Sequence, residues 1–348
     1  MDTNIDRKWP KIAIIVLNWN KWQDTIECLE SVYQITYPNY DVILVDNGSE
    51  DESIQKIKEY CEGTIKVTSG FFNYEPKNKP IKIIEYTKSE AERGNGGKFE
   101  DLPTDRKMIL IKNDKNYGFA EGNNIAMNYA LSALKPDYIL LLNNDTVVDR
   151  EFLSELANAG ESYKSAGIIG PKIYYYDDPK RIWVAAPYGN MGKIDCGEFK
   201  GIIEVKWVVG CAFFLRTSTI NEIGLFDPDF FLYGEESDYC MRVHKAGYKM
   251  YITNSSLIWH KEPLEGKIKP YQVYYENRNT ILLWYKNYPR IKFYIYLIVF
   301  NVRPFRLLRL LRDGRSNLIS PMLLGLKDGV LWCFGIKKAG RSNYIKLK

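Results

Sequence analysis

The chain has 348 residues, 45% of them apolar, which is enough for one large domain with a buried core and a smaller additional region. This composition excludes a mainly disordered protein. Lysine and arginine total 48 against 43 aspartate and glutamate residues, and the net charge of +5 is too small and too dispersed for a nucleic-acid groove. We therefore expect no nucleic-acid partner.

The cysteines and the N-terminus both predict a cytoplasmic protein. The cysteines form no CxxC pair and lack the dense spacing of a disulfide framework, so we expect reduced thiols. They are Cys28, Cys61, Cys196, Cys211, Cys240 and Cys333. Near the N-terminus only about seven apolar residues occur in a row, with no small-residue cleavage site, which predicts a strand and not a signal peptide.

Apolar strands and amphipathic helices alternate in the N-terminal part of the chain. The patterns predict strands at 12–17, 42–45, 108–111 and 138–142, and helices at 24–33, 53–60 and 122–134. This alternation indicates an α/β fold with a doubly wound, mostly parallel sheet covered by helices on both faces. Ligands bind such sheets beyond the carboxyl ends of the strands, where polar clusters lie in this sequence.

A stretch rich in glycine, proline and lysine interrupts the alternation between residues 62 and 107. It contains short strand-like pieces at 64–67 and 81–86. So long an irregular connection is typical of an excursion such as a lid or a partner-binding loop. A solvated insertion without a catalytic part is the alternative, and the sequence leaves both open.

Residues 266–348 are predicted to form a C-terminal helical region. The apolar run at 294–300 is far shorter than the roughly 20 residues that span a bilayer. Arginines interleave with aromatic and leucine residues after it, at Arg303, Arg306, Arg309 and Arg312. This pattern suits a helix at an anionic membrane surface, and it equally suits helices packed on the main domain with a basic solvent face.

Two Asn- and Gly-rich clusters are candidates for binding a nucleotide. Asp46 follows a buried strand and can accept hydrogen bonds from a base or ribose, while Gly48 permits a tight turn close to a ligand. The segment from Asn116 to Asn124 opens a helix whose backbone N–H groups favour a diphosphate. Taken alone, each cluster is also compatible with simple turn and capping residues.

The third cluster, at the end of strand 138–142, offers oxygen ligands for a hard cation. Asn143 and Asp145 lie on the same side of an extended segment, so both can point at one Mg²⁺ or Mn²⁺. His260, at the end of the strand-like segment 257–259, can complete a mixed site. The alternatives are a turn with Thr146 starting a helix and a structural histidine, the role we expect for His244.

The fourth cluster is a dense group of acids, Glu235, Glu236 and Asp238, after an aromatic run. Neighbouring acids raise one another's pKa, and a carboxylate near apolar walls is a better proton acceptor, as deprotonating a sugar hydroxyl requires. Helical spacing would place Arg242 one turn from Asp238, where it can orient an acid. The alternative is a helix N-terminus whose acids complement the helix dipole.

In their order, these clusters resemble the family-2 glycosyltransferases with a GT-A fold, particularly the rhamnosyltransferase-like branch. The resemblance covers roughly residues 10–265. It rests on seven segments: IVLNWN, VDNGSED, NYGFAEGNN, LLNNDT, GCAFFLR, IGLFDPDFFLYGEESDYCMR and IWH. It implies a GT-A domain over 10–265 with an insertion at 62–107, and an inverting transfer of sugar from a nucleoside-diphosphate donor to an acceptor hydroxyl.

The resemblance also implies roles for individual residues. The donor would be bound by Asn18, Asn20, Asp46, Asn116, Gly118, Asn123 and Asn144. The divalent cation, Mg²⁺ or Mn²⁺, would be held by Asn143, Asp145 and His260, although asparagine at 143 departs from the family's DxD motif. The base would be Glu236, with Glu235 second and with Asp238 and Arg242 in support; glutamate at 236 is one methylene longer than the family's aspartate.

The sequence is compatible with more than one donor and more than one acceptor. A dTDP-rhamnose or a UDP-sugar donor fits equally, and the acceptor would be a glycan or a lipid-linked glycan, with the protein in the cytoplasm or on the cytoplasmic face of the membrane. A sugar nucleotidyltransferase would need a Gly-rich, Arg/Lys-bearing loop after the first strand, where this chain has NWNKWQD. A non-catalytic nucleotide-sugar binder is the third alternative.

Overall fold

Contacts divide the chain into two units. The computed structural model describes residues 9–94, 102–184, 186–189, 192–194, 200–263, 268–300 and 310–337. Unit 1 comprises residues 1–116, 122–225 and 243–264, and unit 2 comprises residues 117–121, 226–242 and 265–348. The predicted boundary at 265 falls on residues outside the described part and stays a prediction.

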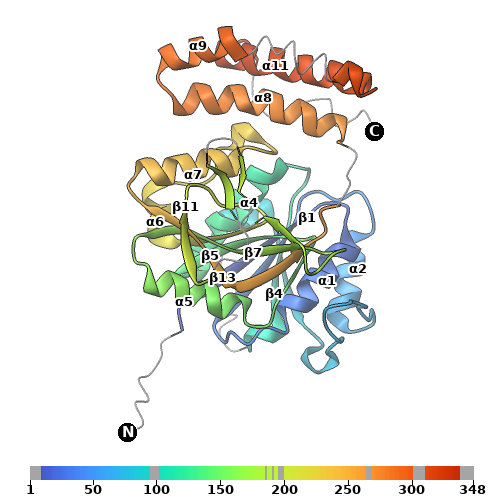
Figure 1. Cartoon of the computed structure of the whole chain (residues 1–348). Helices are drawn as coiled ribbons and strands as arrows, with labels where there is room; N and C mark the ends of the chain where they lie inside the picture. Colours follow the sequence, from blue (N-terminus) through green and yellow to red (C-terminus); the bar gives the residue numbers. More distant parts are fainter. Residues whose placement is uncertain are drawn as a thin grey trace. The chain divides into compact units, whose positions relative to one another are not determined.

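Unit 1 is built on one large sheet (Figure 1). Its strands are β1 (Ile12–Asn18), β2 (Tyr40–Asp46), β3 (Lys82–Thr87), β4 (Lys107–Lys112), β5 (Tyr138–Asn143), β6 (Thr146–Val148), β7 (Ala166–Tyr175), β8 (Ile182–Val184), β11 (Ile202–Val205), β12 (Ala212–Arg216) and β13 (Lys249–His260). Their order is β11-β13-β7-β12-β5-β1-β2-β4-β3, with β6 on β13 and β8 on β7. A separate pair is formed by β9 (Ala186–Gly189) and β10 (Gly192–Ile194).

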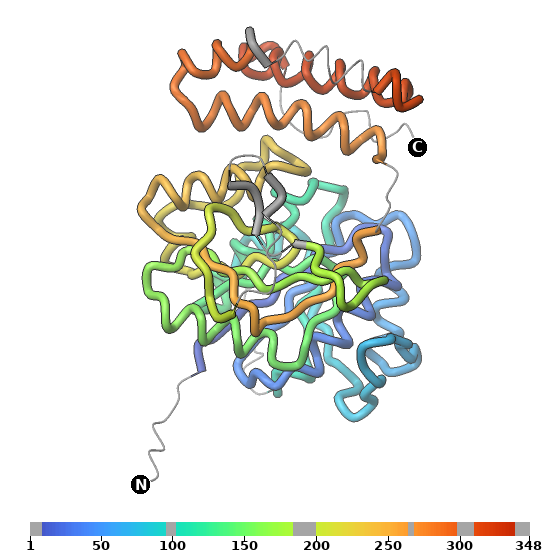
Figure 2. Tube along the Cα trace, viewed as in Figure 1, coloured from blue at the N-terminus to red at the C-terminus, as the bar shows by residue number. Residues whose placement is uncertain are grey.

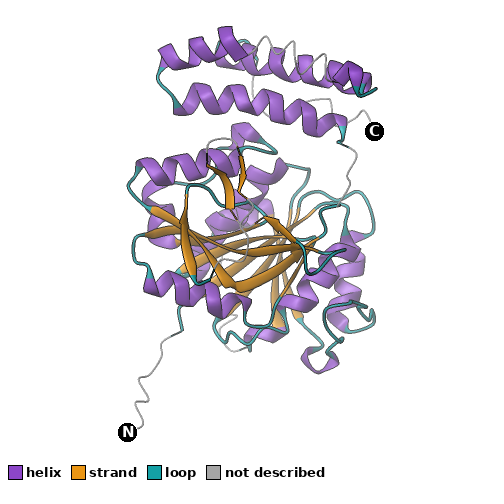
Figure 3. Ribbon diagram, in the orientation of Figure 1, coloured by secondary structure: helices purple, strands orange, loops and turns teal. Residues whose placement is uncertain are grey.

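The strands from β5 to β3 run parallel, whereas β12 runs antiparallel to both β5 and β7. Strands β1 and β2 are almost entirely buried because apolar residues occupy both of their faces. Figure 3 shows helices on both sides of the sheet, as this burial requires. The predicted α/β fold with a doubly wound, mostly parallel sheet is confirmed.

The helices connect these strands and continue into unit 2. They are α1 (Trp22–Val32), α2 (Ser53–Glu62), α3 (Lys88–Glu92), α4 (Gly118–Tyr129), α5 (Phe152–Ser162), α6 (Thr217–Ile223), α7 (Glu235–Lys245), α8 (Pro270–Asn287), α9 (Arg290–Phe300) and α11 (Ile319–Cys333). Short turns of other helix types are η1 (Pro76–Asn78), η2 (Thr104–Arg106), the π-type η3 (Ala130–Leu134), η4 (Pro228–Phe230) and η5 (Ser316–Leu318). The helices predicted at 24–33, 53–60 and 122–134 correspond to α1, α2 and α4 with η3.

One local prediction is wrong, and one alternative is excluded. Residues 64–67 form no strand, because the Thr64 N–H donates to the Glu59 carbonyl at 3.0 Å and closes the end of α2 after Gly63, whose φ is +86°. The light-blue trace in Figure 2 follows this irregular stretch. Thr146 begins the short strand β6 and not a helix, because β6 pairs with the end of β13. The other predicted piece, 81–86, is β3.

The cysteines within the described residues are free and buried, and Cys196 lies outside that part of the chain. The predicted basic membrane-surface helix falls largely outside it too, because Arg303, Arg306 and Arg309 are not described. Arg312 is described and exposed. Among the helices of the described residues, none has the length and apolar character needed to cross a bilayer.

Unit 2 contains a closely packed pair of helices, α8 and α11. A Cβ added at Gly325 would overlap the Tyr274 carbonyl, and one at Gly329 would crowd the Arg278 carbonyl, so these glycines allow the two backbones to approach. The Tyr274 hydroxyl donates to Asp328 Oδ2 at 2.6 Å between the same helices. Because both groups are buried, this bond fixes α8 along α11.

Candidate active site

The carboxyl ends of β1, β2 and β5 lie side by side in unit 1. Asn18 pairs with Asp46 in the parallel register, and Leu17 pairs with Asn143. The Asn47 N–H donates to the Asn18 carbonyl at 2.8 Å and extends this edge. The first and third predicted clusters therefore meet at one edge of the sheet, which is where open α/β sheets bind ligands.

Asp46 is buried and held by neighbouring donors. Its Oδ1 accepts from Asn18 Nδ2 at 2.9 Å and from the Ser49 hydroxyl at 2.6 Å, and its Oδ2 accepts from the Ser49 N–H at 3.0 Å. The Asn20 N–H donates to the Ser49 hydroxyl at 3.0 Å. A carboxylate offers about four lone-pair sites, so Oδ2 keeps capacity for a further donor. Contact between Asp46 and a donor base stays a prediction.

Gly48 forms the predicted tight turn, and its nearness to a ligand stays a prediction. Its φ is +71°, and an added Cβ would overlap the backbone of Lys115 and Asn116. The close approach it permits is therefore to another chain segment of the same site. That segment is also held by amides, because Asn47 Nδ2 donates to Asn116 Oδ1 at 3.1 Å and Asn113 Nδ2 donates to Asn47 Oδ1 at 3.0 Å.

The other predicted donor-binding residues are distributed over both units. Asn123 and Asn124 are buried on the unit 1 part of α4. Asn144 Nδ2 donates to the Thr25 hydroxyl at 2.9 Å, and that hydroxyl donates to Asn18 Oδ1 at 2.7 Å, so Asn144 joins the Asp46 network. Gly118 belongs to unit 2. Their contact with a donor stays a prediction.

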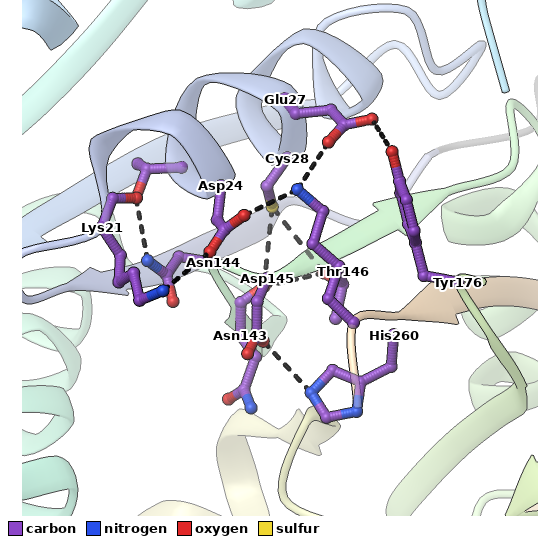
Figure 4. A network of polar contacts seen from close by, with 12 residues as sticks. Lys21, Asp24, Glu27, Cys28, Asn143, Asn144, Asp145, Thr146, Tyr176 and His260 are labelled. Carbon is purple, nitrogen blue, oxygen red and sulfur yellow. Dashed lines mark hydrogen bonds and ion pairs between the residues drawn. The ribbon is translucent and has the colours of Figure 1, made fainter. Parts of the chain in front are cut away.

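Asp145 and His260 are brought together at the edge of the sheet (Figure 4). Strand β6 pairs antiparallel with β13 so that Thr146 lies opposite His260, and Asp145 directly precedes this pair. His260 Nε2 lies 3.1 Å from Asp145 Oδ1. His260 Nδ1 is buried without a hydrogen-bond partner among the described residues, and the imidazole packs on the Trp183 ring with 4.6 Å between centroids.

This pair fits a divalent cation. Burial raises the pKa of Asp145, but the hydrogen bond and charge of His260 and the charge of Lys261 outweigh it and hold that pKa below its usual value. The carboxylate is thus ionised, as a cation ligand must be. No group of three or more histidine, cysteine or acidic side chains gathers as a metal site in the described residues. Cations that bind substrate phosphates commonly use only one or two carboxylates.

Lys261, which the sequence analysis missed, braces the Asp145–His260 pair against α1. Its Nζ donates to Asp24 Oδ1 at 2.7 Å and lies 2.6 Å from Glu27 Oε2. Its backbone N–H donates to the Asp145 carbonyl at 2.9 Å. Figure 4 shows the two acids on the helix above Asp145. Burial lowers the pKa of Lys261, but the hydrogen bonds and charges of Asp24 and Glu27 outweigh burial and raise that pKa.

Replacing Lys261 with methionine is expected to lower the free energy of unfolding by about 1–3 kcal/mol, because Asp24 and Glu27 would lose the cation that lies within hydrogen-bond distance of both. The loss is smaller than for a fully buried pair, since the Lys261 side chain is 22% exposed. Urea-induced unfolding measures this loss of stability.

The control is Lys21→Met. Lys21 Nζ lies 3.8 Å from Asp24 and its side chain is 69% exposed, so we expect the free energy of unfolding to change by no more than about 0.5 kcal/mol. Equal losses in both variants would contradict the bracing role.

Glu235 and Glu236 form an acid pair at the start of α7, within unit 2. Glu235 is 4% exposed and its Oε2 has no hydrogen-bond partner within the described residues, whereas Glu236 is half-buried. Burial raises the pKa of Glu235 well above its usual range, and the charge of Glu236 raises it further. Burial also raises the pKa of Glu236, against hydrogen bonds from the backbone and from the Glu235 side chain. The pair is therefore suited to exchange a proton.

The remaining two predicted catalytic residues contact each other. Arg242 Nε donates to Asp238 Oδ2 at 2.8 Å, one helical turn away, as the spacing predicts. Asn287 Nδ2 donates to the other oxygen of Asp238 at 2.7 Å. One oxygen of this buried carboxylate thus accepts a hydrogen bond from α7 and the other from α8, which suits a role in anchoring α7 to α8. His244 is exposed on α7.

Comparison with known families matches residues 138–327 to the model of glycosyl transferase family group 2, and residues 13–84 to that of glycosyl transferase family 2. The first match alone covers more than half of the chain. This chain is a family-2 glycosyltransferase. The assignment confirms the resemblance and the rhamnosyltransferase-like branch, and it makes the chain an enzyme of the hexosyltransferase type.

Two curated relatives of this glycosyltransferase cover different shares of it. The low-salt glycan biosynthesis hexosyltransferase Agl10 of Haloferax volcanii is 24% identical over 232 residues, which is 63% of this chain and 75% of the relative. The rhamnosyltransferase WbbL of Escherichia coli K12 is 28% identical over 153 residues, 39% of this chain and 57% of the relative. The chain thus spans just over half of the length of WbbL.

Two solved structures share the fold of the glycosyltransferase. The mannosyltransferase PcManGT of Pyrobaculum calidifontis, in complex with GDP-Man and Mn²⁺, has a TM-score of 0.54 at 13% identity and covers 93% of this chain and 88% of its own. GalNAc-T7 with UDP, GalNAc and Mn²⁺ has a TM-score of 0.54 at 14% identity, covering 79% and 48%. These likenesses confirm the predicted GT-A fold.

Proposed function

We propose that this glycosyltransferase moves a sugar from a nucleoside-diphosphate donor to an acceptor hydroxyl with inversion at the anomeric carbon. The donor is dTDP-rhamnose or a UDP-sugar. The acceptor belongs to a cell-surface polysaccharide, a lipid-linked glycan or a glycoprotein. The observation that carries the proposal is the pairing of Asp145 with His260 at the sheet edge that also holds Asn18 and Asp46.

In the proposed reaction, Glu236 removes the proton of the acceptor hydroxyl. The oxygen then forms a bond to the anomeric carbon on the face opposite the diphosphate, and the carbon–oxygen bond to the diphosphate breaks, with its electron pair leaving on the diphosphate. Glu235 holds the proton that it shares with Glu236. Asp238 and Arg242 position the helix that carries both acids.

Asp145 and His260 hold the divalent cation in this proposal, with Asn143 as an amide ligand. A bound Mg²⁺ or Mn²⁺ offsets the negative charge that develops on the departing diphosphate. The fold neighbours solved with Mn²⁺ support a cation of this kind. Asn18, Asn20, Asp46, Asn116, Gly118, Asn123 and Asn144 are proposed to line the donor site.

A donor panel tests the proposal. The purified protein is incubated with Mn²⁺, a lipid-linked glycan acceptor and each of dTDP-rhamnose, UDP-glucose, UDP-galactose and UDP-N-acetylglucosamine, and release of nucleoside diphosphate is followed. We expect acceptor-dependent release with one donor and its loss on addition of EDTA. A protein that binds a nucleoside diphosphate yet releases none from any donor would be a binder and not a transferase. A lipid-linked acceptor would place the enzyme on the cytoplasmic face of a membrane.

A further inference from the structure

The loop that leads into the acid pair has an unusual backbone. Phe231 has φ +61° and ψ −58°, and Tyr233 has φ +66°, a region that residues with a side chain rarely adopt. The Leu232 N–H donates to the Phe230 carbonyl at 2.7 Å, which forms a γ-turn centred on Phe231. Such a conformation persists only where surrounding groups enforce it.

Arg278 and Asn279, two neighbouring residues of α8, supply that enforcement. Arg278 Nη2 donates to the carbonyls of Asp229 at 2.7 Å and Phe230 at 2.6 Å. Asn279 Nδ2 lies 2.8, 2.8 and 2.5 Å from three loop carbonyls, those of Phe230, Leu232 and Tyr233. Arg278 Nε donates to Asn279 Oδ1 at 2.7 Å, so each side chain orients the other.

These contacts are buried and braced. Arg278 is 4% exposed and Asn279 is 2% exposed, so water does not compete for the loop carbonyls. The ring of Tyr275, also on α8, stacks on Phe231 with 5.4 Å between centroids. The Arg278 guanidinium lies 5.0 Å from the centroid of that Tyr275 ring. Because α11 fixes α8 through Gly325 and Gly329, the arginine and the amide project from a rigid element.

The same loop is held on a second side by the start of α4, whose first residues belong to unit 2. The Phe231 carbonyl, turned by the γ-turn, accepts from the Phe119 N–H at 2.6 Å. Gly118 permits this approach, because a Cβ there would overlap the Phe231 carbonyl. The strained backbone thus caps the helix whose N-terminal segment is proposed to line the donor site.

We propose that Arg278 and Asn279 are positioning residues that hold the 230–234 loop in its strained form and thereby fix the Glu235–Glu236 pair. The part of this inference that concerns turnover rests on the proposed function. A displacement of about 1 Å in a reacting group can cost about 100-fold in rate, so the larger effect is expected in kcat. A smaller effect on donor affinity can follow through the Phe119–Phe231 hydrogen bond.

Arg278 also places a positive charge near the acid pair. That charge lowers the pKa of Glu235, opposing the larger effects of burial and of Glu236. Unit 2 has other charged groups near the 230–234 loop. Asp227 and Asp229 precede the loop, and the rest lie on helices: Glu121 on α4, Asp238 and Arg242 on α7, and Lys286 on α8. Asp238 pairs with Arg242, and Lys286 pairs with Asp227 and Asp229.

Asn279→Ala in the full-length protein tests the positioning role. We expect kcat to fall about 10- to 100-fold, dissociation constants for dTDP and UDP to change far less than kcat, and amide hydrogen exchange at 230–234 to speed up about ten-fold or more. The control is Asn277→Ala, since Asn277 is equally buried on α8 but donates to the Val273 carbonyl of its own helix at 2.6 Å. Unchanged exchange and kcat in a folded Asn279→Ala protein would overturn the proposal.

Two variants of Arg278 separate its charge from its geometry. Arg278→Lys keeps the charge but loses the planar fork, so we expect a lower kcat with an unchanged acidic limb in the pH profile. Arg278→Met loses both the charge and the fork, so the acidic limb is also expected to move to higher pH, because a cation favours the ionised carboxylate. Arg278→Lys also serves as the test should Asn279→Ala not fold. Wild-type rate and exchange in Arg278→Lys would overturn the proposal.

Two of these readouts do not depend on turnover. Hydrogen exchange of the loop and titration of the glutamate carboxyls, followed by NMR with ¹³C-labelled glutamate, are measured on the protein alone. If the wild-type protein transfers no sugar while Asn279→Ala loosens the loop and Arg278→Met raises the glutamate pKa, the proposed function fails and the positioning role stands. If transfer is found and neither readout moves, the positioning role fails alone.

Discussion

Glu236→Gln is expected to lower kcat by about 10²- to 10⁴-fold while dTDP or UDP binds with Mn²⁺ as it does to the wild-type protein. The substitution keeps the size of the side chain and removes its capacity to accept a proton. Turnover of the identified donor and isothermal titration with the nucleoside diphosphate measure the two quantities separately. The matched control is Glu276→Gln, an exposed glutamate of α8, for which we expect wild-type turnover.

The pH dependence of turnover follows from the environment of the same pair. Burial raises the pKa of Glu236, and burial together with Glu236 raises the pKa of Glu235. A general base must be ionised, so the rate is expected to fall as the pH drops through the raised pKa of the pair, at a higher pH than an ordinary glutamate would give. An acidic limb at the usual pKa of an exposed glutamate would count against a buried base.

Glu235→Gln distinguishes the two acids. If Glu235 holds the shared proton, a glutamine amide can donate to Glu236 in its place, and turnover is expected to stay within about ten-fold of wild type. Loss of turnover in Glu235→Gln with retention in Glu236→Gln would assign the base to Glu235. Normal turnover in both variants would remove the pair from the chemistry.

Residues at strand ends could be predicted because their positions follow from the local pattern. A buried apolar run fixes where a strand ends, and parallel neighbours bring their ends to one edge, so Asn18, Asp46 and Asn143 were expected together and lie together. The pairing of His260 with Asp145 was expected from the ligand chemistry of the two side chains and again from the family resemblance, and the 3.1 Å contact agrees with it.

Residues that act through tertiary contacts left no comparable signal. Lys261 follows a strand and reads as a surface lysine, and only the fold shows that Asp24 and Glu27 surround it. Arg278 and Asn279 lie in the C-terminal region that the sequence predicts only as helical, and only the fold shows their contacts with the 230–234 loop. Asn47 and Asn113 each lie two residues after a predicted strand and directly after β2 and β4 in the structure, so their positions were a usable signal for the hydrogen bond between them.

The direction of strands was beyond the sequence pattern. Ala212–Arg216 is an apolar run like the others, yet it enters the sheet antiparallel between β5 and β7. Hydrophobic periodicity reports burial and not direction, so it cannot tell a reversed strand from a parallel one. The resemblance to the family supplied the GT-A architecture that periodicity alone could not.

Asp145→Ala is expected to weaken Mn²⁺ binding in the presence of the nucleoside diphosphate by about 10- to 100-fold, and His260→Ala by about ten-fold. The carboxylate supplies the charge that a hard cation prefers, and the imidazole contributes one neutral ligand. Electron paramagnetic resonance of free Mn²⁺ measures the affinity without any acceptor. Turnover at a fixed low Mn²⁺ concentration is expected to fall with it and to recover in part as the cation is raised.

The asparagine at position 143, where the family has an aspartate, allows a variant that is expected to strengthen Mn²⁺ binding. The expected extended segment is wrong, because β5 ends at Asn143 and residues 144–145 form a turn. Asn143→Asp would place another carboxylate two residues before Asp145, at the start of this turn, so Mn²⁺ should bind about ten-fold more tightly. The control is Asp149→Ala, whose carboxylate accepts from the Glu151 N–H at 2.9 Å and is not expected to affect the cation. If the Mn²⁺ affinities of Asp145→Ala, His260→Ala and Asn143→Asp all equalled that of the wild-type protein, the cation would be bound elsewhere. The Asp145–His260 contact would then have a structural role only.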